Sequence, residues 1–243
     1  QGGDGAATGV LGAGVGGHNL GLLLVTPGFA QDLETYLPGW LMFVNRNGQR
    51  FIDETIEYSV LASALNDQPG QECFAIFDEE SRKAARTTAY RPAPNWTADR
   101  LAELTAQGYI TSAPTLAALA EKLGIRADAL EATAARYNQN VATQHDASFF
   151  KPSTMLRPVA TGPFYAARVK AAIICWTGCG LKIDTDAHVL DEAGRPIAGL
   201  YAAGETTSGM FGACYAAGGA SIANAVVYGR IAGRNAAADA VAG

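Results

Sequence analysis

A short apolar run that leads into a long stretch of small residues constrains the fold more than any other part of the chain. Residues 199–203 are typical of a buried strand, which Gly204 and Glu205 end. Small residues continue to Gly219, and a small-residue helix is predicted from about Ser221 to Val241. A strand, a glycine-rich turn and a helix start allow backbone N–H groups to approach a polar ligand. The same residues also fit an ordinary strand–helix unit that uses small side chains for close packing.

The composition describes an ordered globular protein. With 243 residues, of which 49% are hydrophobic and 17% charged, the chain can hold one large domain or two smaller ones. A net charge of −5 and the absence of a basic cluster argue against a nucleic-acid partner. No apolar run approaches the roughly 20 residues that cross a bilayer, so we expect no membrane span. No signal peptide is recognisable in a chain that begins at Gln1, and we expect a cytoplasmic protein.

The cysteines give no sign of a metal site. The chain has four cysteines and three histidines, and the cysteines follow no zinc-ligand spacing. Cys175 and Cys179 stand closest together, in a strand-like context. We therefore expect no metal, and free thiols as in an intracellular protein.

Gly12, Gly14 and Gly17 form a Gly-x-Gly-x-x-Gly motif, and Asp32 follows about 20 residues after its first glycine. The motif binds dinucleotides only when an apolar strand precedes it and a helix follows it. Residues 2–9 are not apolar, and residues 20–27 are typical of a strand rather than a helix. We therefore do not interpret these glycines as a dinucleotide-binding fingerprint.

The middle of the chain mixes strands and helices. Residues 40–45 and 50–54 are predicted as the two strands of a hairpin, with Asn47 and Gly48 in the turn. A short helix with Tyr58 in its first turn is expected to follow. Further elements are expected as a strand over 72–78, helices from Asp78, over 115–124 and over 126–143, a long strand or two over 164–177, and a hairpin over 187–197. Without a regular strand–helix alternation, residues 25–175 are typical of an α+β block inserted into another domain.

Several separated motifs carry a family resemblance. They are the hairpin from Val44 to Glu54, residues 163–166, residues 177–184, and the segment from Gly199 to Glu205 with its Gly-Arg-Ile-Ala-Gly continuation. In this order they resemble the fumarate reductase/succinate dehydrogenase superfamily of flavoproteins. The resemblance implies an α/β plus α+β fold, in which a partial, Rossmann-like FAD-binding domain (residues 1–19 and 177–243) carries an inserted α+β capping domain (residues 20–176).

The resemblance also implies that half of the FAD-binding domain is not in this sequence. In the family, the dinucleotide fingerprint lies upstream of the segment that matches residues 2–5. The remaining strand and C-terminal helix would then keep an exposed edge and an uncovered apolar face, which is costly in water. The hypothesis is that the chain is one piece of a larger flavoprotein. A separate or cleaved chain would supply the N-terminal half, forming a heterodimer.

Three positions indicate what kind of substrate to expect. Where fumarate reductases have an arginine proton donor, a substrate-binding arginine and a histidine, this chain has Tyr58, Tyr215 and Trp176. Arginine binds a carboxylate through two parallel hydrogen bonds, which tyrosine cannot do. A dicarboxylate substrate is therefore not expected.

The two tyrosines instead resemble those of 3-ketosteroid dehydrogenases. By that resemblance, Tyr58 removes a proton next to a ketone, while Tyr215 and the Gly219 N–H polarise the carbonyl oxygen. The loop departs from those enzymes at Ala217. Together with Trp176, Ala217 would line the substrate pocket. The expected substrate is therefore either a steroid, which would place the protein in steroid metabolism, or another cyclic ketone. The alternative is structural: Tyr58 would cap the hairpin, and Tyr215 would pack in a core.

The resemblance assigns cofactor roles to the C-terminal segment. Glu205 would hydrogen-bond the ribityl hydroxyls of FAD, and Gly204 would allow close approach. Ala220, Ser221 and Ile222 would open a helix whose N–H groups and dipole face the flavin.

Two other functions remain open from the sequence. The first is the reverse reaction, in which reduced flavin reduces the C=C bond of an enone or acrylate. The second is a fragment or assembly subunit that binds no flavin.

Overall fold

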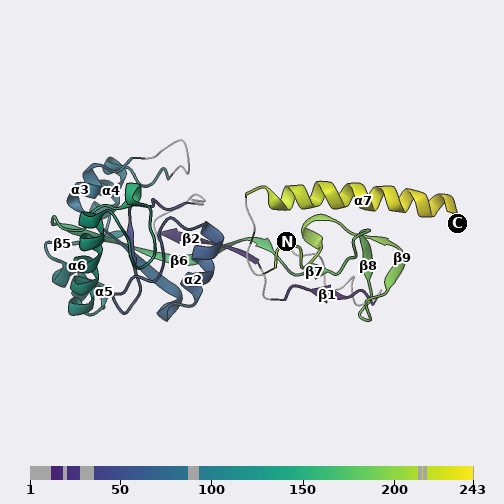
Figure 1. Ribbon diagram of the computed structural model, residues 1–243, viewed down its shortest axis with the longest axis horizontal. Coiled ribbons are helices and arrows are strands. Elements are labelled where there is room, and N and C mark those ends of the chain that lie inside the picture. Colours follow the sequence, from purple (N-terminus) through teal and green to yellow (C-terminus); the bar gives the residue numbers. More distant parts are fainter. Residues whose placement is uncertain are drawn as a thin grey trace. The chain divides into compact units, whose positions relative to one another are not determined.

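The computed structural model describes residues 12–18, 21–27, 36–86, 93–212, 215 and 218–242 (Figure 1). The chain divides into two compact units. One, here called the terminal unit, comprises Gln1–Leu23 with Ile174–Gly243. The other, the central unit, comprises Leu24–Ile173. Each unit is described by itself below.

A five-stranded sheet forms the framework of the central unit. Its strands are β2 (Gly21–Pro27), β3 (Met42–Val44), β4 (Glu72–Asp78), β5 (Ile110–Ala113) and β6 (Phe164–Thr177). The order is β2-β6-β4-β3, and β5 also pairs with β6. β4 runs antiparallel to β6, from Glu72 opposite Lys170 to Asp78 opposite Phe164. Every residue of β4 is buried, as its nearly continuous apolar sequence requires of a central strand.

Helices cover this sheet. They are α2 (Tyr58–Asn66), α3 (Glu79–Lys83), α4 (Ala98–Ala106), α5 (Leu116–Leu123) and α6 (Ala127–Thr143). Leu119 of α5 and Leu130 and Tyr137 of α6 join a buried cluster with alternate residues of the strands, among them Met42 and Phe74. The helices predicted at Tyr58, from Asp78, over 115–124 and over 126–143 are confirmed. Short 3₁₀ turns lie at Pro69–Gln71 and Ser153–Met155.

The prediction of a second strand in the 40–54 hairpin is wrong. The turn exists, because Gly48 N donates to the carbonyl oxygen of Asn45 at 2.9 Å. The Asn45 side chain also accepts hydrogen bonds from the backbone N–H groups of Asn47 and Gln49. Beyond the turn, however, residues 50–57 form no strand, and β3 pairs with β4 instead. The side chains of Arg50 and Glu54 point into a buried charge network, which sets the path of this segment in place of a strand ladder.

The terminal unit consists of short strand pairs and one long helix. The pairs are β1 (Val15–Gly16) with β7 (Gly180–Leu181), and β8 (His188–Leu190) with β9 (Pro196–Tyr201). The helix is α7 (Ala220–Ala242), and a 3₁₀ turn lies at Gly204–Thr206. The predicted hairpin over 187–197 and the predicted C-terminal helix are both confirmed.

Gly17 explains why the Gly-x-Gly-x-x-Gly motif is no nucleotide-binding turn. β1 lies inside the motif and pairs with β7, and the next element that the structure describes is the strand β2, not a helix. Gly17 has φ +70°, and a Cβ at this position would lie 1.9 Å from the carbonyl oxygen of Gly178. Glycine is required here because two backbone segments of the terminal unit touch.

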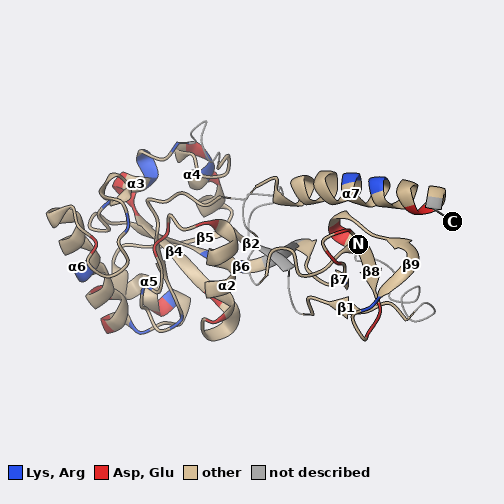
Figure 2. Cartoon of the chain, turned by 45° about the vertical axis from the view of Figure 1, so that its right-hand side comes forward, with Lys and Arg blue, Asp and Glu red and all other residues tan. Residues whose placement is uncertain are grey.

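In the terminal unit, β9 and one face of α7 are exposed. Of residues 199–203, which are predicted as a buried strand, only Ala202 is buried, because β9 pairs with β8 alone. On α7, Ile222, Val226 and Val227 are 70%, 65% and 53% exposed. In Figure 2 few residues along this helix are coloured as charged. An apolar, nearly uncharged face of this length is unusual on a surface that meets water.

Candidate functional site

Glu205 lies at the carboxyl end of β9, where the chain makes a 3₁₀ turn. Its Oε1 accepts hydrogen bonds from the N–H of Thr177 at 3.2 Å and from the Thr177 hydroxyl at 3.4 Å. Gly204, the residue before it, has φ +77°, a left-handed backbone conformation that favours glycine at this position. The Gly204 carbonyl oxygen accepts from the Thr207 hydroxyl at 2.7 Å, and this locks the turn. The exposed carboxylate is thus held against the end of β6, with one oxygen engaged there.

Tyr215 lies at the N-terminus of α7. Its phenol oxygen accepts a hydrogen bond from the backbone N–H of Ser221 at 2.9 Å and pairs with the Ser221 hydroxyl at 2.8 Å. Gly219, at φ +87°, accepts from Ala223 N and so begins the helical ladder. A helix start has N–H groups without partners inside the helix, and a phenol oxygen satisfies one of them here. The polar end of Tyr215 therefore lies at the positive end of a helix dipole.

The ring of Tyr215 belongs to an aromatic cluster. Its centroid lies 5.8 Å from that of Trp176 and 5.2 Å from that of Phe211, and the Trp176 and Phe211 centroids lie 5.2 Å apart. Trp176 and Tyr215 are 6% and 7% exposed. This packing holds the phenol in one orientation, which is the preorganisation that a catalytic hydrogen-bond donor needs.

Two buried polar atoms of the terminal unit have no hydrogen-bond partner among the described residues. They are Nε1 of Trp176, a donor, and Oδ1 of Asn224, an acceptor in the first turns of α7. The Asn224 amide group reaches the Gly204 carbonyl oxygen at 3.5 Å. Buried polar groups are nearly always paired in folded proteins, so an unpaired donor and acceptor indicate where a ligand's polar atoms would bind.

The structure brings most of the predicted site residues into one unit. Trp176, Gly204, Glu205, Tyr215, Gly219, Ala220, Ser221 and Ile222 all belong to the terminal unit. Ala217 lies outside the described residues. Sequence reasoning missed Phe211 and Asn224. Asn224 could have been found as a polar residue in an otherwise small and apolar helix, whereas no sequence signal marks Phe211.

Tyr58 belongs to the central unit, where it is the first residue of α2. It is 6% exposed, and its ring makes an edge contact with that of Tyr36 at 5.5 Å between centroids. Its predicted pairing with Tyr215 across a substrate stays a prediction.

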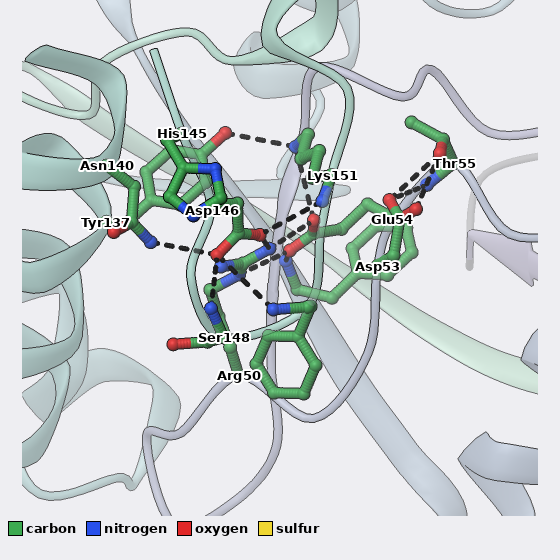
Figure 3. Close-up of polar contacts among 12 residues, drawn as sticks. Arg50, Asp53, Glu54, Thr55, Tyr137, Asn140, His145, Asp146, Ser148 and Lys151 are labelled. Carbon is green, nitrogen blue, oxygen red and sulfur yellow. Dashed lines mark hydrogen bonds and ion pairs between the residues drawn. The ribbon is translucent and has the colours of Figure 1, made fainter. Parts of the chain in front are cut away.

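A buried charge network supports the segment that leads to Tyr58 (Figure 3). The Arg50 guanidinium donates to both carboxylate oxygens of Glu54, at 2.9 and 2.8 Å. It also donates to Asp146 at 2.9 Å. Lys151 Nζ lies 3.2 Å from Glu54 and donates to the Leu41 carbonyl oxygen at 2.7 Å. The side chains of Glu54, Asp146 and Lys151 are wholly buried, so two positive and two negative charges compensate each other away from water.

Burial and pairing act against each other in this network. Burial alone would lower the pKa of Arg50, but hydrogen bonds and charge attraction from Glu54 and Asp146 outweigh it and raise that pKa. Burial alone would raise the pKa of Asp146, and the hydrogen bond from Arg50 reverses this and lowers it. For Lys151, burial prevails and lowers its pKa despite the attraction of Glu54. Asp146 is therefore held in its charged form, and its contact with Arg50 fixes the segments 50–54 and 146–151 to one another.

Neither a metal cluster nor a spanning helix is found in the described part of the chain. No group of three or more His, Cys, Asp or Glu side chains there is arranged to hold a metal ion. No helix there is long and apolar enough to cross a bilayer.

Comparisons with known proteins agree with a flavin site. The family model described as FAD binding domain matches residues 27–222. The chain is 33% identical over 229 residues, 92% of its length, to NADH:fumarate oxidoreductase of Klebsiella pneumoniae (strain 342). It is 39% identical over 199 residues, 82% of its length, to NADH:acrylate oxidoreductase of Vibrio harveyi.

A solved structure shares the fold. It is that of 3-ketosteroid delta1-dehydrogenase from Sterolibacterium denitrificans in complex with 1,4-androstadiene-3,17-dione. It matches 96% of this chain at 26% identity and a TM-score of 0.80. The chain spans 46% of that protein, and 23% and 19% of the two oxidoreductases.

Proposed function

Because the chain belongs to the FAD binding domain family, within the fumarate reductase/succinate dehydrogenase superfamily, we propose that it forms the flavin-facing part of a ketone dehydrogenase. FAD is its cofactor. The reaction would remove two hydrogens from the carbon pair next to a ketone, in a steroid or another cyclic ketone. The observation that carries this proposal is Tyr215, a phenol held at the N-terminus of α7 where a dicarboxylate enzyme of the superfamily would need an arginine.

The residues of the terminal unit fit the cofactor. The carboxylate of Glu205 can accept hydrogen bonds from ribityl hydroxyls, and Gly204 leaves room for close approach. The unpaired Oδ1 of Asn224 can accept one more. Ser221 lies in the first turn of α7, whose dipole stabilises negative charge at its N-terminus. When bound, FAD supplies the hydride acceptor of the reaction.

The aromatic cluster supports a neutral substrate. Trp176, Phe211 and Tyr215 offer ring faces and no cation, which suits a flat, uncharged ring better than a carboxylate. Tyr215, with the Gly219 N–H, would donate hydrogen bonds to the ketone oxygen as negative charge develops on it. Trp176 Nε1, a buried donor, is available to a further acceptor of the ligand. Tyr58 would remove the proton next to the ketone, and the central unit would act as the capping domain that carries it.

The uncovered face of α7 supports a second half of the FAD-binding domain. Ile222 and Val226 are exposed, and Gly229 and Gly233 continue the same face at helical spacing, where an added Cβ would meet no atom within 4 Å. An apolar, small-residue face of this kind suits close packing against another segment. We expect that segment to carry the dinucleotide fingerprint, either in a longer chain or as a separate or cleaved partner, and full activity to need it.

The second candidate is the reverse reaction. The 39% identity to an NADH:acrylate oxidoreductase favours a reductase of an activated C=C bond. The same residues would serve it, since Tyr215 would still hold the carbonyl oxygen while Tyr58 would deliver the proton.

One anaerobic experiment separates the candidates. The protein is purified with its complete FAD-binding domain, and its flavin spectrum is recorded, because a preparation without flavin would leave only the assembly-subunit alternative. A dehydrogenase is bleached by a saturated cyclic ketone. A reductase is not, but after photoreduction it regains its oxidised spectrum with an enone or acrylate. Reoxidation by fumarate with no response to any ketone or enone would overturn the proposal.

A further inference from the structure

A cavity of about 290 Å³ lies entirely within the central unit, and none of the proposed flavin-site residues lines it. One wall is a face of α6, formed by Thr133, Arg136, Tyr137 and Asn140. These positions follow one another at intervals of three, one and three residues, so they form one stripe along the helix. Apart from Tyr137, which itself joins the core, the stripe is polar and lies beside the apolar positions of α6.

The floor of the cavity is the Arg50 guanidinium, whose side chain is 6% exposed. Its carbon lies 4.9 Å from the centre of the Tyr137 ring and 5.0 Å from that of Phe149, so two rings flank the charge. Figure 3 shows Arg50, Tyr137, Asn140 and Ser148 around this point. A buried cation between two rings gives the cavity a rigid and partly aromatic base.

The charges around the cavity sum to a positive value. Glu54 and Asp146 are engaged by Arg50 and Lys151, and Asp146 also accepts from Asn140 and from backbone N–H groups. This group of four is neutral. Arg136, in contrast, forms no ion pair with any residue that the structure describes. Its exposed guanidinium therefore leaves the rim one positive charge in surplus.

The geometry points to a binding site for a small planar monocarboxylate with an aromatic ring. Arg136 would hold the carboxylate through two hydrogen bonds, with the Ser148 hydroxyl and the Gln49 amide as further donors. The half-buried ring of Phe149 would contact the apolar part of the ligand. A volume of about 290 Å³, at about 30 Å³ for each water-sized group, admits about ten non-hydrogen atoms. That is the size of benzoate.

Calorimetric titration of the flavin-loaded protein with benzoate tests the site at constant ionic strength. We expect saturable binding with one site for each chain. Benzamide, the neutral molecule of the same shape, should bind at least about tenfold more weakly because it offers no charge to Arg136. The Arg136→Gln variant should bind benzoate at least about tenfold more weakly than the original protein.

Arg126→Gln is the matched control, because Arg126 precedes the same helix and pairs with Asp128 at the surface, outside the cavity. It should change the affinity less than about twofold. The site is refuted if benzoate gives no saturable heat, if Arg136→Gln binds as the original does, or if inorganic phosphate binds as tightly as benzoate. Because the readout is binding alone, it is independent of which redox reaction the flavin carries out.

Discussion

The phenol oxygen of Tyr215 accepts a hydrogen bond from the backbone N–H of Ser221 at 2.9 Å, so a side chain six residues upstream caps the start of α7. This contact joins helix formation to the proposed chemistry, because the group that caps the helix is also the proposed donor to the ketone. Replacing the phenol should therefore affect the two functions unequally.

The Tyr215→Phe variant should lose turnover much more than stability. We expect kcat/KM to fall by about 10²–10³-fold, since a single oxyanion-stabilising donor is removed. The loss of one helix cap costs only about 1 kcal/mol of unfolding free energy. Steady-state kinetics and urea denaturation, with flavin content checked by absorbance, measure both. Ser221→Ala is the control that keeps the phenol, and a Tyr215→Phe enzyme with turnover near that of the original would contradict the assigned role.

Glu205→Gln should weaken flavin binding. The neutral amide keeps the shape but loses charge-assisted hydrogen bonds, for which we expect at least about a tenfold rise in the FAD dissociation constant. Fluorescence titration of the apoprotein with FAD measures this. Glu192→Gln, an exposed change in the turn between β8 and β9, should leave the affinity unaltered. Equal affinities for the two variants would exclude Glu205 as a cofactor contact.

Arg50→Met should destabilise the central unit strongly. It leaves the buried carboxylates of Glu54 and Asp146 without their shared partner, and breaking such a pair costs about 3–5 kcal/mol. Urea denaturation measures the difference. Arg195→Gln breaks an ion pair whose arginine is 79% exposed, and it should cost less than about 1 kcal/mol. If Arg50→Met were as mild as Arg195→Gln, the network would have no structural role.

Glu79 should contribute to acid sensitivity in a narrow pH window. The hydrogen bond from Arg82, supported by one from the Tyr165 hydroxyl, lowers the pKa of Glu79 to about 2. Because this pKa lies below the unfolded value of about 4.3, the carboxylate stabilises the fold above that pH, and the contribution disappears as the pH falls toward 2. Glu79→Gln should flatten the stability profile in this window. Glu80→Gln, whose side chain is 63% exposed, should leave the profile as it is.

Gly17→Ala should disrupt the terminal unit. The new methyl group would lie 1.9 Å from the Gly178 carbonyl oxygen, so the β1–β7 pair must move apart. Gly12→Ala is the matched control. Gly12 has a similar φ of +68°, but a Cβ at this position would meet no atom within 4 Å. Its substitution should therefore cost only the backbone strain, about 1 kcal/mol. Hydrogen exchange at β7 should rise far more in Gly17→Ala than in Gly12→Ala. Equal exchange in both variants would mean that the close approach of Gly17 and Gly178 does not matter.

Local patterns predicted local structure well. The helix over 126–143 carries its apolar residues at helical spacing, and it forms as α6. Thr115 and Gly124 bracket α5, where the threonine caps the first turn and the glycine adopts the left-handed conformation that ends it. Such signals need no knowledge of distant residues.

Local sequence patterns did not predict the structure where contacts between residues distant in the sequence determine it. The local pattern of residues 50–54 predicts a strand, but Arg50 pairs with Asp146, 96 positions away, and no local pattern indicates that partner. The predicted burial of residues 199–203 fails at every position but Ala202 for a related reason, because an apolar run tells what a strand would bury but not whether a neighbour is present. The site residues came from family motifs, and Phe211 and Asn224 emerged only from packing.

The bare face of α7 has a thermodynamic consequence. If another polypeptide segment covers Ile222, Val226 and Val227, the stability of the terminal unit depends on how often that segment is in place. For a tethered segment the dependence is set by its effective concentration, and for a separate chain by the amount of partner. The melting temperature of the terminal unit would then rise with partner concentration by mass action, and flavin bound at the proposed site in this unit would raise it further.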